Sequence, residues 1–301
     1  MTRPFEAKLM TNIPHLEQLE NRRLMSATLV NGLLTVIGTA GDDNITVSYR
    51  SDTKWFNVGV NGQGTSFGHA HVDRIIIFGL AGNDMISASH VAGFKPGVII
   101  KGGDGNDYIK GGRNRDLLIG GAGDDSIFGN ASDDTLLGQD GNDLLKGVIG
   151  SDLLIGGEGD DDLEELDGPN TLKGGGGDDH LHGGTGIFLG GDGNDSISGT
   201  GIIDGGGGDD DLAGNGFVCG GDGNDYLNGS GKMFGGAGDD QLHGSGDADV
   251  LKGGDGNDSL WGGERHDRLT GGPGSDDFFN VQRVKELRDY NIEDVNLGSP
   301  L

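Results

Sequence analysis

Aspartate residues that follow glycines at a fixed spacing are the feature of this sequence with the clearest chemical meaning. From Gly102 the chain reads GGDGNDYIK, GGRNRDLLI, GGAGDDSIF, GNASDDTLL and GQDGNDLLK, so the sixth residue of each group of nine is aspartate. A carboxylate oxygen is a hard ligand, and Ca²⁺ takes six to eight oxygen ligands at about 2.3–2.6 Å in proteins. The spacing therefore predicts a regular series of calcium-binding loops.

Glycines surround each of these aspartates at the first, second and fourth positions of the nine. Glycine adopts positive φ angles and lets the backbone approach a ligand closely. We therefore predict tight six-residue loops whose backbone carbonyl groups also face the cation. The loop glycines expected to do this include Gly103, Gly105, Gly121, Gly123, Gly191, Gly193, Gly221, Gly223, Gly254 and Gly256.

The three residues after each loop predict the elements that hold the loops in place. They form short β-strands, in which alternate side chains face opposite sides, so the eighth position points inwards. This position is almost always Leu or Ile. The core is therefore expected to be a column of single side chains, running through Ile109, Leu118, Ile127, Leu136, Leu145 and Leu154 to Leu260, Leu269 and Phe278.

The repeat closely resembles the G-G-x-G-x-D-x-U-x nonapeptide of the RTX (repeats-in-toxin) calcium-binding family. The resemblance covers about residues 102–279. It implies an all-β fold, a right-handed parallel β-roll (a β-solenoid) in which two nonapeptides make one coil. It also implies that Ca²⁺ lies between the loops of successive coils on the same side.

If two repeats make one coil, alternate repeats lie on the same edge of the roll. The edge that begins with the repeat at Gly102, here called the intact edge, has glycine at position 4 and aspartate at position 6 in all eleven repeats. Eleven loops leave ten intervals, so we predict about ten Ca²⁺ ions. The predicted ligands are Asp107, Asp125, Asp143, Asp161, Asp179, Asp195, Asp210, Asp225, Asp240, Asp258 and Asp276.

The opposite edge, here called the degraded edge, keeps the repeat poorly. Its loops begin GGRNRD, GNASDD, GVIGSD and ELDGPN, and three six-residue versions follow, GTGIID, GNGFVC and GSGKMF. A hexapeptide is too short to wrap a cation, so we expect the middle of this edge to be free of metal. Weaker candidate ligands are Asp116, Asp134, Asp152, Asp249 and Asp267, together with Asp43 and Asp84 from two isolated upstream nonapeptides.

The composition indicates where the folding energy comes from. Only 33% of the residues are hydrophobic, 65 of 301 are glycine and the net charge is −28. Such a chain buries too little apolar surface to offset its backbone entropy, so bound Ca²⁺ is expected to drive folding. The negative charge disfavours nucleic acid and anionic lipid as partners, and no segment is apolar enough to span a membrane. Calcium is abundant outside cells, so we expect an extracellular or cell-surface protein.

The ends of the chain differ from the repeats. Residues 1–28 are expected to be a targeting segment, because LEQLENRRLMSA at 16–27 resembles the LEPRxLL-type motif of exported proteins of planctomycete-like bacteria; an amphipathic helix is the alternative. Residues 29–101 predict a β-rich, irregular solenoid cap with Trp55, Phe56 and Phe67 in its core. The RTX resemblance implies that 280–301 form closing strands and a candidate type I secretion signal.

Signals for catalysis are weak. No HExxH motif occurs, and GTSFG around Ser66 is expected to be a turn rather than a nucleophile site. The pairs His69/His71 and His180/His182 are expected to be exposed, and Cys219 to be a small buried residue. We predict a non-enzymatic calcium-binding protein with a structural or interaction role, whose candidate partners are a surface polysaccharide or another cell-surface protein. The alternatives are a polysaccharide-active, alginate epimerase-like protein or a haemolysin-like one.

Overall fold

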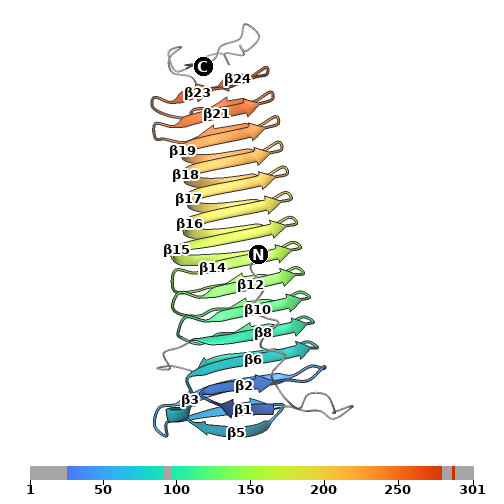
Figure 1. Ribbon diagram of the computed structural model, residues 1–301. Helices are drawn as coiled ribbons and strands as arrows, with labels where there is room; N and C mark the ends of the chain where they lie inside the picture. Colours follow the sequence, from blue (N-terminus) through green and yellow to red (C-terminus); the bar gives the residue numbers. More distant parts are fainter. Residues whose placement is uncertain (1–25, 91–96, 280–286, 289–301) are drawn as a thin grey trace, which may run out of the picture.

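The computed structural model describes residues 26–90, 97–279 and 287–288. The described chain is an all-β solenoid of about ten turns, whose strands stack along one long axis (Figure 1). This confirms the fold class expected from the sequence. The predicted targeting motif at 16–27 and most of the predicted closing segment at 280–301 lie outside the described residues.

The first part of the roll alternates between two sheets. One sheet contains β8 (Val98–Asp104), β10 (Leu117–Ala122), β12 (Thr135–Asp140) and β14 (Leu153–Glu158). The other contains β9 (Tyr108–Lys110), β11 (Ser126–Phe128) and β13 (Leu144–Lys146). Each strand pairs in parallel with the strand one coil later, as Leu118 does with Leu136. Two nonapeptides therefore make one coil of 18 residues.

The middle of the roll has longer strands, because the degraded edge no longer interrupts them with a loop. These strands are β15 (Asp162–Gly176), β16 (His180–Asp192), β17 (Ser196–Gly207), β18 (Asp211–Asp222) and β19 (Tyr226–Ala237). Each runs through one sheet, turns at the degraded edge and continues through the other sheet, and in β17, β18 and β19 the turn is a hexapeptide. Leu212 pairs with Leu227, so a coil here takes 15 residues.

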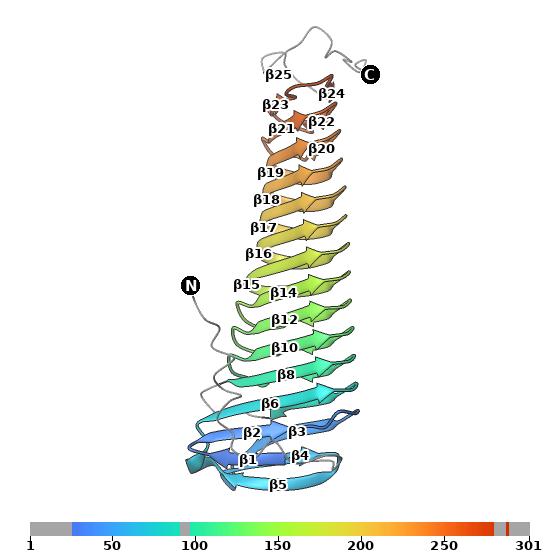
Figure 2. The same ribbon diagram turned by 45° about the vertical axis from the view of Figure 1, so that its right-hand side comes forward.

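Nine-residue spacing returns near the C-terminus. The strands are β20 (Gln241–Gly244), β21 (Val250–Asp255), β22 (Ser259–Trp261), β23 (Arg268–Thr270), β24 (Asp277–Phe279) and β25 (Leu287–Arg288). They continue the same two sheets with parallel pairing, β25 against β23 (Figure 2).

The N-terminal cap combines roll strands with a meander. Its elements are β1 (Ser26–Val30), β2 (Leu33–Ile37), β3 (Asn44–Arg50), β4 (Trp55–Val60), β5 (Gln63–Gly68), the 3₁₀ helix η2 (His69–His71), β6 (Arg74–Ala81) and β7 (Met85–His90). β2 pairs in parallel with β6, and β3 with β7, which extends the roll. β1, β4 and β5 pair antiparallel and close its end, as a solenoid needs to protect its terminal edge.

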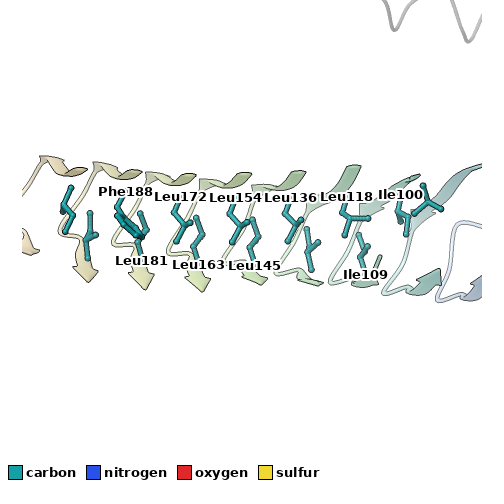
Figure 3. Close-up of a cluster of buried hydrophobic side chains, with 14 of the residues drawn as sticks. Ile100, Ile109, Leu118, Leu136, Leu145, Leu154, Leu163, Leu172, Leu181 and Phe188 are labelled. Carbon is teal, nitrogen blue, oxygen red and sulfur yellow. The ribbon is translucent and has the colours of Figure 1, made fainter. Parts of the chain in front are cut away.

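The core is a double column of single aliphatic side chains. Ile100, Leu118, Leu136 and Leu154 come from one sheet and interleave with residues such as Leu145 from the other (Figure 3). All of them are fully buried. The expected eighth-position column is therefore confirmed.

In the cap, the core prediction was wrong for one aromatic residue. Trp55 is 47% exposed, whereas its neighbour Phe56 is fully buried and Phe67 packs partly against the core. Adjacent residues of a strand face opposite sides, so β4 can bury only one of Trp55 and Phe56.

Candidate metal centre

The predicted ligands of the intact edge form one continuous ladder. The backbone N–H of each aspartate donates to Oδ1 of the aspartate in the next coil, as from Asp107 to Asp125 at 2.7 Å and from Asp143 to Asp161 at 2.8 Å. These residues sit in the loops that line the right-hand edge of the roll in Figure 1. The edge brings all eleven together: Asp107, Asp125, Asp143, Asp161, Asp179, Asp195, Asp210, Asp225, Asp240, Asp258 and Asp276.

The same ladder extends into the N-terminal cap. The backbone N–H of Asp84 donates to Oδ1 of Asp107 at 2.7 Å, and the backbone N–H of Asp43 donates to Oδ1 of Asp84 at 2.8 Å. The sequence placed both residues among the weaker candidates, because their repeats are isolated from the others along the chain. In space they are the first two of thirteen aspartates in a row, with twelve intervals between them.

The second carboxylate oxygen of these residues supports cation binding. From Asp84 to Asp258, Oδ2 is buried and has no hydrogen-bond partner. A Cβ placed on Gly120 would touch Oδ2 of Asp125 and lie 2.9 Å from the carbonyl oxygen of Gly138. Around a first glycine such as Gly120, acceptor oxygens therefore lie close together, and Oδ2 has no hydrogen-bond donor. A buried acceptor without a donor destabilises the fold by about 1–3 kcal/mol if it is neutral, and by more if it is charged. A hard divalent cation suits such an all-oxygen set.

The loop glycines adopt the conformation expected from the sequence. Gly121 and Gly123 have φ angles of +139° and +120°, and a Cβ on Gly121 would touch the carbonyl oxygen of Gly103. All ten glycines predicted for the loops have positive φ. Non-glycine residues are strained there, so these positions shape the loop and keep the coils close together.

A second ladder runs beside the first and was missed in the sequence analysis. It is made by the fifth residue of each repeat. Its direction is opposite: Asp124 donates its N–H back to Oδ1 of Asn106 at 3.1 Å, and Asn142 donates back to Oδ1 of Asp124 at 3.0 Å. The signal was present, because the fifth residue on the intact edge is Asn or Asp in every repeat before Ser275.

The degraded edge carries only short pieces of such a ladder. The backbone N–H of Asp116 donates to Oδ1 of Asp134 at 2.8 Å, and that of Asp134 donates to Oδ1 of Asp152 at 2.6 Å. The backbone N–H of Asp152 donates to Oδ1 of Asn170, where the series ends. A second piece joins Asp249 to Asp267 at 2.9 Å. The structure thus shows the predicted difference between the edges in the backbone, while the difference in calcium occupancy stays a prediction.

The carboxylates of the degraded edge also differ from one another. Oδ2 of Asp116 accepts the Gly112 N–H at 2.5 Å, and Oδ2 of Asp249 accepts the Ser245 N–H at 2.9 Å. Oδ2 of Asp134 and of Asp152 is buried without a hydrogen-bond partner. Of these four aspartates, Asp134 and Asp152 therefore resemble those of the intact edge.

Glu165 is a further carboxylate that the sequence analysis missed. It is 1% exposed and replaces the first glycine of its repeat. Its Oε2 accepts the Val148 N–H at 2.6 Å, and its Oε1 accepts the Asp167 N–H at 3.0 Å. A Cβ on Gly147 would touch both Oε2 of Glu165 and Oδ2 of Asp152. Two carboxylates therefore face each other in a buried place.

Burial dominates the electrostatics of both edges. It raises the pKa of Asp125 and Asp161 from 3.8 to about 7, and neighbouring aspartates add to this, although a backbone N–H donor opposes it. Burial likewise raises the pKa of Glu165 to about 7. Ionising all these groups without a counterion is unfavourable, so the ladder favours either protons or metal cations.

The histidine pairs do not add to these ladders. His69 and His71 lie in η2 rather than on a strand, so they do not share a strand face. His180 and His182 are exposed on β16, and their Nδ1 atoms lie 3.4 Å from Asp162 Oδ1 and 2.7 Å from Ser198 Oγ. The expected exposure is confirmed for His71, His180 and His182, but it was wrong for His69, which is half-buried because its ring stacks on Phe56 at a centroid distance of 5.9 Å.

Two other sequence predictions were wrong. Cys219 is only half-buried, because it points to the outer face of β18 while Val218 fills the core. Ser66 lies within strand β5 rather than in a turn.

Within the described residues, no three His, Cys, Asp or Glu side chains form a group able to hold a metal ion.

Comparison with known proteins agrees with this geometry. The model of the RTX calcium-binding nonapeptide repeat (4 copies) matches residues 101–136, 110–145, 137–164, 166–187, 234–264 and 253–279. No curated protein matches the chain. In the described part of the chain, no helix is long and apolar enough to cross a membrane. Residues 188–233, which contain the first two hexapeptides and all but the last residue of the third, lie outside the repeat matches.

Proposed function

We propose that this chain, which carries RTX calcium-binding repeats, is a calcium-dependent structural or interaction protein whose β-roll folds outside the cell. The observation that supports this most is the series of buried Oδ2 atoms without hydrogen-bond partners along the intact edge. Bound Ca²⁺ would neutralise the buried carboxylates and would be coordinated by their oxygen atoms. The aspartates of neighbouring coils and the loop carbonyl groups would hold it.

The chain's own residues prepare the edge for the cation. Each Oδ1 is fixed by a backbone N–H of the neighbouring coil, such as Asp125 Oδ1 by Asp107 at 2.7 Å. This bond orients the carboxylate and leaves Oδ2 as the acceptor that lacks a partner. The glycines keep side chains out of the same space. The site is therefore assembled only when two coils stack, which couples cation binding to folding.

The magnitude of this coupling is large enough to decide folding. Extracellular calcium modules have Kd values of about 10⁻⁴–10⁻³ M per site. At a tenfold excess of free Ca²⁺, one such site stabilises the folded state by about 1.4 kcal/mol. About ten sites would then contribute roughly 14 kcal/mol, which is comparable to the stability of a whole domain. Inside cells, where Ca²⁺ is scarce, this contribution would vanish.

Calcium titration tests the proposal. Far-ultraviolet circular dichroism should show a largely disordered chain in EGTA and a β-rich one in millimolar Ca²⁺, and calorimetry should give a stoichiometry of about ten to twelve ions. Equal concentrations of Mg²⁺ should not fold the chain, because Mg²⁺ requires near-octahedral geometry and loses water reluctantly. Equal order and equal thermal stability in excess EGTA would overturn the proposal.

We favour this role over a polysaccharide-active or haemolysin-like one because the buried polar residues described above serve the ladders. The calcium-loaded protein should therefore leave alginate and other polyuronates unchanged. Unsaturated uronate fragments detected by mass spectrometry, or epimerised uronates detected within the polymer by NMR, would instead support the enzymatic alternative.

A further inference from the structure

One outer face of the roll is unusually apolar. It belongs to the sheet with β10, β12 and β14, which is in front in Figure 1 and continues through the second halves of β15 to β19. Two columns of outward side chains run along it, from Leu117 to Lys232 and from Ile119 to Phe234, and we call them the apolar face. Eleven of their sixteen residues are Leu, Ile, Phe or Cys.

The opposite sheet shows that this composition is not a general property of the roll. Its corresponding columns run from Ser126 to Gln241 and from Phe128 to His243, and among those four residue types they contain only Leu144 and Phe128. The apolar face is also open to solvent at its centre, where Ile187, Ile202 and Phe217 are 39%, 46% and 43% exposed. Contiguous exposed apolar surface of this kind marks an interaction site.

Charge singles out the same face. On a chain with a net charge of −28, these columns contain three charged residues, and Asp204 is the one acid beside Lys173 and Lys232. The calcium-loaded roll still exposes carboxylates along its edges and on the opposite sheet, such as Asp124, Asp162 and Asp211, and like charges placed against each other repel. This face is the part of the roll where a second copy can approach without placing rows of carboxylates against each other.

The positions of Lys173 and Asp204 suggest how the second copy would lie. Lys173 pairs in register with Leu189, and Leu189 pairs with Asp204, so the two charges stand one coil before and one coil after Leu189. They are two coils apart, about 9.6 Å at the usual strand spacing, which is too far for a direct ion pair. In the described residues, neither takes part in an ion pair.

We propose that two copies of this chain pair through their apolar faces about a two-fold axis that passes Leu189, with their long axes antiparallel. Such an axis lies in the interface and places each column against the same column of the second copy, with the coils in reverse order. Lys173 then faces Asp204 of the second copy, and the symmetry forms this pair twice. The same register places Leu137 against Phe234 and Leu153 against Phe217 of the second copy.

The size of the face suits a reversible dimer. In the register about Leu189 the face overlaps that of the second copy over seven coils, which makes the contact about 34 Å long at about 4.8 Å per coil, and two columns of side chains make it roughly 15 Å wide. The pair would bury about 1,000 Å² in total, which is about the area expected of a specific interface.

Sedimentation velocity in millimolar Ca²⁺ tests the pairing. The wild-type protein should be a dimer at about 100 µM, and Phe217→Asp should weaken dimerisation at least tenfold. Ala213→Asp is the matched control, because Ala213 is exposed on the same strand, β18, in the opposite sheet; it should leave the dimer intact. A monomeric wild-type protein, or equal effects of the two substitutions, would overturn the proposal.

A charge exchange tests the register. Lys173→Glu and Asp204→Lys should each raise the dissociation constant about tenfold, because each places like charges opposite each other, and the double variant should restore the wild-type value. Absence of rescue would refute this arrangement. Binding of calcium-loaded monomers to neutral phospholipid vesicles, lost in Phe217→Asp, would assign the face to a lipid surface instead.

Circular dichroism of every variant in Ca²⁺ confirms that the roll is folded, so a failure of pairing is distinguishable from a failure of calcium-dependent folding.

Discussion

The backbone N–H of Asp43 donates a 2.8 Å hydrogen bond to Oδ1 of Asp84, although 41 positions separate the two residues in the chain. The next bond in the series joins Asp84 to Asp107, the first aspartate of the regular repeats. The N-terminal cap and the repeats therefore share one edge. The cap is the first part of the ladder rather than a separate plug.

Asp84→Asn should uncouple the cap from the repeats. Asp84 borders two intervals of the ladder, so the substitution should lower the calcium stoichiometry by one or two ions and raise the calcium concentration needed to fold residues 26–90. Native mass spectrometry and hydrogen exchange measure these effects. Asp52→Asn, in an exposed turn beside Arg50, should change neither. An unchanged stoichiometry in Asp84→Asn would show that the ladder starts at Asp107.

The two edges should respond differently to the same substitution. Asp143→Asn removes a carboxylate whose Oδ2 is buried without a hydrogen-bond partner, whereas Oδ2 of Asp116 already accepts the Gly112 N–H. We expect Asp143→Asn to lower calcium stoichiometry and to reduce Tm in Ca²⁺ by several degrees. Asp116→Asn should keep the stoichiometry. Calorimetry and thermal melts compare the two, and equal losses of calcium would contradict the difference between the edges.

Glu165 should contribute to a cation site with Asp152 on the degraded edge. The two carboxylates are buried together, and a cation between them would allow both to be ionised. Glu165→Gln should therefore reduce calcium stoichiometry by about one and lower Tm in Ca²⁺. Glu164→Gln, at the next residue and paired with Lys146 at the surface, is the control. A higher Tm with the stoichiometry unchanged would indicate a shared proton instead.

The sequence predicted the repeating parts because the same local rule applies in every coil. Glycine at the first position, aspartate at the sixth and Leu or Ile at the eighth were enough to place Asp125 on the edge and Leu136 in the core. The register is then fixed, because a slip by one residue would expose the whole core column.

The exceptions arose where the repeat changes in sequence or in length. Glu165 replaces the first glycine of a nine-residue repeat, and Cys219 ends a hexapeptide, so an intact copy does not predict the role of either residue. In GNGFVC, the alternation of side chains along the strand determines which residue faces the core. Val218 is in register with Ile203 and Met233, and all three are buried. Cys219 must then face outwards. The alignment of Asp43 with Asp84 was also missed, because the meander β4–β5 lies between their strands along the chain.

Acid should partly replace calcium in ordering the roll. Burial raises the pKa of Asp125 and Asp161 to about 7 in the folded state, from 3.8. The folded state therefore binds more protons than the unfolded one between about pH 4 and 7. The resulting stabilisation is fully present below about pH 4 and is lost as the pH rises through 7. In EGTA, the β-sheet signal in circular dichroism should be stronger at pH 5 than at pH 8.

Matched substitutions separate this effect from the change in overall charge. Replacing Asp125 and Asp161 by Asn should weaken the pH dependence in EGTA. Replacing the exposed Asp162 and Asp211 by Asn removes the same charge and should leave it unchanged. A β-sheet signal that increases with pH would contradict the sign of the prediction.

Gly199 should be intolerant of a side chain because of a single aromatic ring. A Cβ on Gly199 would lie 2.6 Å from Cε2 of Phe188, which is fully buried where the hexapeptides narrow the coil. Gly199→Ala should destabilise the calcium-loaded roll by about 1–3 kcal/mol through overpacking. In Gly199→Ala/Phe188→Leu the smaller side chain makes room, so the loss should be less than the sum of the two single losses. Gly207→Ala is the control, since a Cβ there meets no atom within 4 Å. Additive losses in chemical denaturation would show that the contact with Phe188 does not limit this position.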